Sequence, residues 1–108
     1  MILYNKAVRD KIPEIIKADG KECRFKILSN EEFLVELEKK LGEEIEEYRR
    51  SWEIMELVDV MEILYRVAEL KGVSANRFEL LRERKRAERG GFSENLFRAR
   101  CYLITGLL

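Results

Sequence analysis

Apolar side chains recur every three or four residues along most of this chain of 108 residues, which is the period of an amphipathic α-helix. The first long stretch begins after Ser29 and Glu32, two residues at the spacing of a capping box, and continues to Tyr48. The second begins at Ile54, ends before Gly72 and is apolar around most of its circumference. We therefore expect two long helices, the second being the most buried element of the fold.

Shorter elements are expected ahead of the first long helix. Asp10 stands where its side chain would cap a short helix over residues 12–16, and Asp19 and Gly20 would end that helix. Apolar and basic residues then alternate from residue 23 to residue 27. This alternation suits a short, half-buried strand better than a helix.

A third long helix is predicted between a cap at Ser74 and the glycine pair that begins at Gly90. The tail from Phe92 is rich in apolar residues, so we expect it to dock on the chain's own core or on another subunit. Three long helices form a thin core for so many apolar residues. The predicted fold class is all-α: one domain over residues 1–108, in which a third helix crosses an antiparallel helix pair and dimerisation completes a four-helix-type bundle.

Composition narrows the chemistry. The 21 Lys and Arg residues balance 21 Asp and Glu residues, so no net positive field attracts nucleic acid or an anionic membrane. The absence of histidine excludes His-dependent nucleophiles and imidazole zinc sites. Cys23 and Cys101 are far apart in the sequence, and we expect both to be buried free thiols. No apolar stretch is long enough to span a membrane, which favours a soluble, cytoplasmic protein.

Acidic residues on the two long helices carry the strongest chemical signal. Glu44 and Glu47 stand three residues apart on the first helix, so both project from one helix face. Glu56 and Asp59 do the same on the second helix. A turn near residues 50–52 would bring the two pairs face to face at matching levels. Four carboxylates packed between two helices repel one another, so a cation is expected there.

A hard divalent cation suits such a site. Carboxylate oxygens favour Mg²⁺, with Mn²⁺ as the alternative, and either ion supports hydrolysis of phosphate esters or anhydrides without histidine. The competing interpretation is a solvated acidic helix face, which describes Glu43 taken singly at least as well. Arg49, Arg50 or Arg66 would then pair with the carboxylates of the second helix in a structural network.

These acidic segments resemble the signature of the MazG-like, all-α nucleoside triphosphate pyrophosphohydrolases, in which Glu-Glu-x-x-Glu is followed on the next helix by Glu-x-x-Asp. Residues 4–16 and residues 89–92 resemble a small branch of that family, described as predicted nucleotide or phosphoribosyl-ATP pyrophosphohydrolases. The resemblance leaves the tail uncovered. Ala7 replaces the Leu that is usual in the opening segment, and the interval from Glu47 to Glu56 is short for the wider family.

The resemblance implies a MazG-like bundle, a reaction and a set of site residues. Water would attack the α-phosphate of a nucleoside triphosphate and release pyrophosphate and a monophosphate, with Glu43 or Glu47 orienting the water. House-cleaning of noncanonical nucleotides is one such role, and ordinary deoxynucleotides and phosphoribosyl-ATP stay open as substrates. The implied magnesium ligands are Glu44, Glu47, Glu56 and Asp59.

Basic residues provide candidate contacts for the phosphates. Lys85 and Arg89 lie four residues apart on one face of the third helix, and the resemblance favours them over the neighbouring arginines. Arg9 and Lys11 either approach phosphate or anchor the N-terminal segment through ion pairs, and the sequence leaves both readings open. The alternative to an enzyme is a non-catalytic helical module that binds a metal or a nucleotide, with the carboxylates in structural ion pairs.

Overall fold

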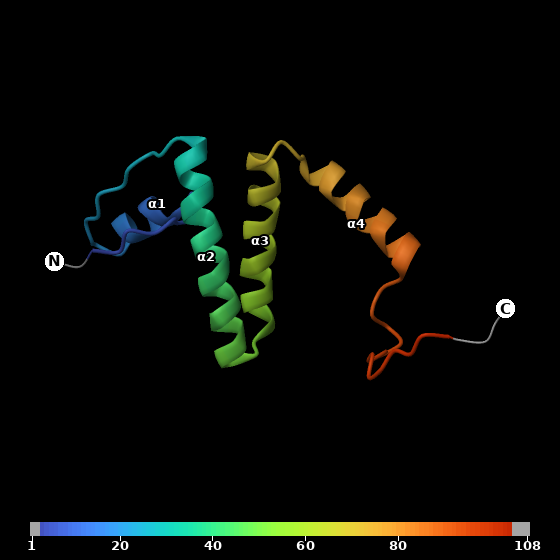
Figure 1. Ribbon diagram of the computed structural model, residues 1–108. Helices are drawn as coiled ribbons and strands as arrows, with labels where there is room; N and C mark the ends of the chain where they lie inside the picture. The colour runs from blue at the N-terminus through green and yellow to red at the C-terminus, as the bar shows by residue number, and fades with distance from the viewer. Residues whose placement is uncertain (1–2, 105–108) are drawn as a thin grey trace.

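The structure, a computed structural model, describes residues 3–104, and those residues contain four helices and no strand (Figure 1). The all-α class is therefore confirmed. The strand predicted over residues 23–27 is wrong, because residues 21–29 form an irregular connection with no neighbouring strand to pair with. The helices are α1 (Ile12–Ala18), α2 (Asn30–Ser51), α3 (Ile54–Leu70) and α4 (Ala75–Arg89).

The antiparallel pair predicted from the sequence is formed by α2 and α3, which lie side by side in Figure 1. The capping box at the start of α2 is confirmed, since the side chain of Ser29 accepts a hydrogen bond from the backbone N–H of Glu32 and the carboxylate of Glu32 accepts one in return. The tight connection to α3 requires Trp52 to adopt a left-handed backbone conformation, with φ of 59° and ψ of 20°. Its ring packs edge to face against Tyr48 at 5.3 Å between centroids.

The N-terminal arm, residues 3–11, packs on the α2–α3 pair through a small core. Ala7 is only 7% exposed and forms a buried cluster with Leu37 of α2 and Ile63 of α3. The methyl side chain of Ala7 leaves room for the backbone of the arm to approach both helices. This contact fixes the arm beside the middle of the helix pair, close to the acidic residues of the sequence signature.

The short helix α1 follows the arm, but the predicted cap by Asp10 is wrong. The helix begins at Ile12, and Lys11 occupies the N-cap position without a capping hydrogen bond from its side chain. Asp10 stands one residue too early to reach the free N–H groups of the first turn. Pro13 lies in the first turn, where its missing N–H group is tolerated.

The last helix, α4, contacts α3 but not α2 and diverges from the pair along its length (Figure 1). Ser74 caps it, as predicted, and Gly90 ends it with a φ of 84°. Near its start, the hydroxyl of Tyr65 on α3 donates a hydrogen bond to Glu79 at 3.1 Å, and Arg82 pairs with the same carboxylate. Helix α4, the third long helix of the prediction, therefore packs against α3 alone and does not cross both helices of the pair.

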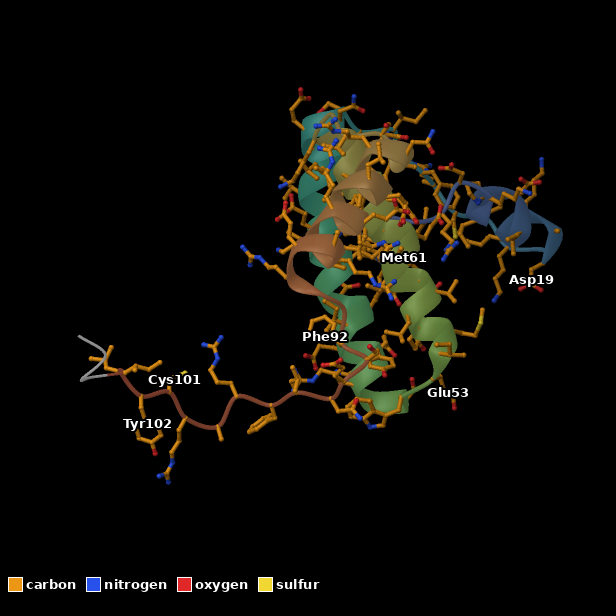
Figure 2. The ribbon with its side chains drawn as sticks, turned by 90° about the vertical axis from the view of Figure 1, so that its right-hand side faces the viewer. Asp19, Glu53, Met61, Phe92, Cys101 and Tyr102 are labelled. Atoms are coloured by element: carbon orange, nitrogen blue, oxygen red, sulfur yellow. The ribbon has the colours of Figure 1, made fainter. Side chains whose placement is uncertain are left out.

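Residues 92–104, the described part of the tail, do not dock on the core of their own chain, contrary to that part of the prediction. Figure 2 shows Cys101 and Tyr102 on an extended segment that runs away from the helices, and Phe92 is 99% exposed. Both cysteines are exposed as well, so the prediction of buried thiols is wrong: Cys23 lies in the irregular connection and Cys101 in the tail. Leu107 and Leu108, two apolar residues at the end of the tail, lie outside the described residues.

The burial expected of the second long helix is only partly found. Helix α3 supplies the buried residues Ile63 and Ala68, but several of its apolar side chains face solvent. The radius of gyration is 20.1 Å, against about 13 Å for a compact domain of roughly 100 residues. The single chain thus leaves much of its apolar surface uncovered. None of the described helices has the combination of length and apolar content needed to cross a bilayer.

The capping box gives a direct test of the helix pair. Replacing Ser29 by Ala removes the acceptor of a free N–H group at the start of α2, so the free energy of unfolding should fall by about 1 kcal/mol. Urea denaturation followed by circular dichroism measures this change. Ser93→Ala, in the loop after α4, is the control and should leave stability within about 0.5 kcal/mol of the original. An equal loss in both variants would contradict the cap.

Candidate functional site

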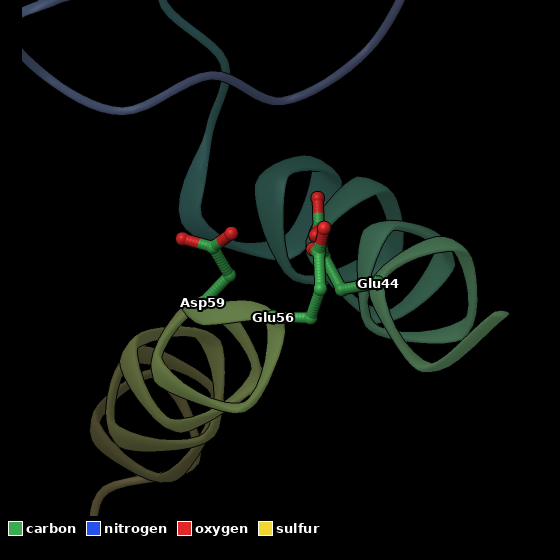
Figure 3. Close-up of side chains that lie close together, drawn as sticks. All are labelled: Glu44, Glu56 and Asp59. Carbon is green, nitrogen blue, oxygen red and sulfur yellow. The ribbon is translucent and has the colours of Figure 1, made fainter. Parts of the chain in front are cut away.

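Three carboxylates from two helices meet on one side of the α2–α3 pair. Glu44 comes from α2, and Glu56 and Asp59 come from successive turns of α3. One oxygen of each lies within 4.8 Å of the others, and all three residues are partly buried. Figure 3 shows the three side chains pointing to the same side of the helices, toward the N-terminal arm. We call this group the acidic cluster.

The local sequence explains why these side chains converge. The three-residue interval between Glu56 and Asp59 places both on one face of α3. The tight turn at Trp52 then brings that face against α2 at the level of Glu44. The predicted meeting of the two acidic ridges is found for these three residues.

The other two glutamates of the signature lie outside the acidic cluster. Glu47 is exposed, and its carboxylate pairs with Arg50 one turn along α2, at 3.5 Å. It nevertheless lies close enough for its charge to act on Glu56. Glu43 is an exposed residue of α2. The structure thus places Glu47 at the edge of the cluster and Glu43 on the helix surface beside it.

Glu56 experiences the repulsion that the sequence predicts. Partial burial raises the pKa of its carboxyl above the ordinary value, and the negative charges of Glu44, Asp59 and Glu47 raise that pKa further. Among residues 3–104 no basic side chain forms an ion pair with Glu56. The centre of the cluster therefore holds a carboxylate whose ionised form is disfavoured.

Positive side chains offset the charges around Glu56. The ammonium of Lys40 lies 3.7 Å from Glu44, one turn earlier on α2, and both side chains are largely buried. Lys40 is not among the site residues predicted from the sequence, although its four-residue spacing from Glu44 is a recognisable helical ion-pair signal. Its presence lowers the electrostatic cost of placing Glu44 against α3.

Arg9 reaches the acidic cluster from the N-terminal arm. Its Nη2 donates a hydrogen bond of 2.7 Å to Oδ1 of Asp59, joining residues that are 50 positions apart. Of the two roles considered for Arg9, the structure shows the anchoring ion pair. Lys11, two residues further along, is exposed at the N-cap of α1 and forms no ion pair within residues 3–104.

The candidate phosphate contacts on α4 are not brought to the acidic cluster in one chain. Lys85 lies at the rim of a groove of about 510 Å³ between α3 and α4, whose walls are almost entirely apolar. Arg89 is the last residue of α4 and borders a hollow formed with residues 90–98. Because α4 diverges from the helix pair on the side away from the arm, these residues lie apart from Arg9 (Figure 1).

The donor set of the acidic cluster fits a hard divalent cation. It offers carboxylate oxygens only, their spacing allows one ion to contact all three residues, and the site's partial exposure leaves room for water. A divalent ion would also relieve the repulsion felt by Glu56. The residues that could hold Mg²⁺ or Mn²⁺ are thus Glu44, Glu56 and Asp59, with Glu47 nearby.

Comparisons with known proteins assign no family to the chain. No protein-family model matches it, and no solved structure matches it. An uncharacterised protein of Mycolicibacterium smegmatis is 45% identical over 44 residues, which cover 41% of this chain and 45% of that protein. The chain therefore aligns with less than half the length of this relative.

The raised pKa of Glu56 makes a prediction about stability without divalent ions. Because this carboxyl binds its proton more tightly when folded, its contribution to stability is lost as the pH rises through the raised pKa. Glu56→Gln should therefore raise the melting temperature at neutral pH in EDTA, and the difference should vanish below about pH 4, where Glu is protonated in both states. Calorimetry over a pH series measures both effects.

The matched control is Glu62→Gln, an exposed position further along α3 and outside the acidic cluster. This variant should melt with the original protein throughout the series. A lower melting temperature for Glu56→Gln at neutral pH would show that the Glu56 carboxylate is stabilised by its surroundings, against the geometry described above.

Proposed function

We propose that this protein is a metal-dependent nucleotide pyrophosphohydrolase, which cleaves a nucleoside triphosphate or related nucleotide to a monophosphate and pyrophosphate. The observation that carries the proposal is the acidic cluster, because it gathers oxygen donors from two helices within 4.8 Å. Mg²⁺ is the proposed ion and Mn²⁺ the alternative. The resemblance of the acidic segments to the MazG-like signature supports the choice of a nucleotide as substrate.

The residues of the cluster have distinct proposed tasks. Glu44, Glu56 and Asp59 hold the ion, and the bound ion would neutralise phosphate charge and lower the pKa of a water molecule. Glu47 lies at the edge of the cluster with its carboxylate exposed, which suits a group that orients water or adds a ligand. Glu43, on the same helix surface, is the second candidate for orienting water.

Phosphate binding needs cations near the carboxylates. Arg9 is already at the cluster, and its planar guanidinium can donate two parallel hydrogen bonds to phosphate oxygens. Lys11 is exposed on the same arm and is a second candidate. Lys85 and Arg89 belong to the proposal only if a second copy of the chain brings its α4 to the site, since within one chain they point elsewhere.

A second copy is proposed because α3 leaves an apolar stripe uncovered. Ile54, Val58 and Met61 follow one another at helical spacing, and all three are exposed in the single chain. Packing this stripe against its counterpart in another copy would form a four-helix arrangement and complete a core that is thin in the monomer. We propose a homodimer on this basis.

The proposed reaction is tested with purified protein and a panel of nucleoside triphosphates and phosphoribosyl-ATP, with and without Mg²⁺. Phosphorus NMR should detect pyrophosphate and a monophosphate only when the metal is present. Glu56→Ala and Asp59→Ala should each lower the rate by about a hundredfold or more, because each removes an ion ligand. Glu62→Gln, outside the cluster, should react at the original rate.

Other products would change the conclusion. Diphosphate and orthophosphate would support metal-dependent hydrolysis but assign the reaction to a different bond. Normal turnover by both Ala variants would exclude the acidic cluster as the site. A folded protein that binds Mg²⁺ but converts no nucleotide would favour the non-catalytic binding module.

The proposed dimer makes a prediction that does not depend on activity. Light scattering coupled to size exclusion should give twice the mass of a single chain at micromolar concentration. Val58→Glu places a charge within the apolar stripe and should shift the protein to the mass of one chain. Ile27→Glu adds the same charge at an exposed position of the irregular connection and should leave the mass unchanged. A single-chain mass for the original protein would contradict the dimer.

A further inference from the structure

The ion pair between Arg9 and Asp59 differs from the other ion pairs around the acidic cluster. Lys40 and Arg50 are each within four residues of their partner on α2, so the helix itself holds each pair together. Arg9 comes from the N-terminal arm and meets Asp59 across 50 positions of sequence. Its approach depends on the tertiary contact of the arm, and the guanidinium can leave Asp59 without any change in α2 or α3.

Two observations indicate that Arg9 can move while the arm stays in place. Ala7, two residues earlier, is buried against Leu37 and Ile63, so it anchors the arm independently of the ion pair. The side chains of Arg9 and Asp59 are 51% and 40% exposed, and an ion pair this accessible to water contributes little to stability. Little free energy is therefore lost when a competing cation displaces Arg9 from Asp59.

We propose that Arg9 is an exchangeable counterion of the acidic cluster: a divalent ion displaces its guanidinium from Asp59, and Ala7 keeps the freed side chain beside the site. The proposal rests on the proposed function in one respect, namely that the acidic cluster binds a divalent ion. It adds that ion binding and the contact between Arg9 and Asp59 are coupled.

The direction of the coupling follows from charge. A divalent ion at the cluster attracts Asp59 more strongly than a single guanidinium does, and it repels the positive charge of Arg9. Linkage then requires the reverse effect: if the ion weakens the contact of Arg9, Arg9 must weaken binding of the ion by the same factor. The freed guanidinium, which has five N–H donors, would be available to the phosphate of an incoming nucleotide.

The coupling is measured by titrating the full chain with Mn²⁺ alone and following free Mn²⁺ by electron paramagnetic resonance. Arg9→Gln should bind Mn²⁺ more tightly than the original protein, by about two- to fivefold, as expected for loss of an exposed competing ion pair. Arg24→Gln is the matched control, because it removes the same charge from the exposed connection before α2 and should leave the affinity unchanged. Circular dichroism verifies that both variants keep their helices.

A second measurement uses the unmodified chain and so does not depend on a variant. Hydrogen exchange followed by mass spectrometry should show that Mn²⁺ accelerates exchange at Ile12, whose backbone N–H donates a hydrogen bond to the carbonyl of Arg9 at 3.1 Å. Residues around Leu37 and Ile63 should keep their protection, since the packing of Ala7 persists. Loss of protection throughout the arm and both helices would mean general unfolding and would overturn the proposal.

The outcomes separate the two proposals. If the original chain binds Mn²⁺ and Arg9→Gln binds it equally or less tightly, the proposed displacement of Arg9 is wrong and the proposed metal site is retained. If Arg9→Gln binds Mn²⁺ and the original chain binds it only weakly, the result supports strong competition between Arg9 and the ion at Asp59. If neither protein binds Mn²⁺ while both are folded, the proposed metal site and the proposed displacement of Arg9 are both wrong.

Discussion

Mutual repulsion of the carboxylates between α2 and α3 is the constraint on which the site depends. Partial burial and three negative neighbours raise the pKa of Glu56, so the cluster is unfavourable unless positive charge compensates it. Lys40 and Arg9 supply part of that charge at Glu44 and Asp59. The compensating positive charges thus lie around the acidic cluster. A divalent ion would relieve the most repulsion at the centre of the cluster.

The N-terminal arm links this electrostatic arrangement to packing. Ala7 fills a small space between Leu37 and Ile63, and that contact brings Arg9 to Asp59. One short segment therefore completes the small core and neutralises one carboxylate. The rest of the molecule packs less closely, because α4 contacts α3 alone and residues 92–104 stay in solvent. An apolar stripe on α3 and a radius of gyration of 20.1 Å are consistent with a fold that gains further packing from another copy.

Local rules succeeded where the interactions are local. The capping box at Ser29, the cap at Ser74 and the ends of the long helices follow from residues within one turn of each other. They failed where a local pattern needed distant support: residues 23–27 alternate like a strand, yet no other strand is present in the described part of the chain to accept their hydrogen bonds. The predictions of buried thiols and of a docked tail are wrong for the same reason. Burial of these segments requires an apolar surface to pack against, and the described part of the single chain offers none beside them.

The sequence by itself determined the helices, the connection that folds α3 back on α2, and the spacing that puts Glu56 and Asp59 on one face, because each depends on backbone geometry over a few residues. Tertiary structure decided which carboxylates meet, leaving Glu47 at the edge with Arg50. Tertiary structure also decided that Arg9 contacts Asp59 and that Lys85, on α4, lies apart from the acidic cluster. These outcomes depend on how the arm and α4 pack against the helix pair, and helical periodicity carries no information about contacts across tens of residues.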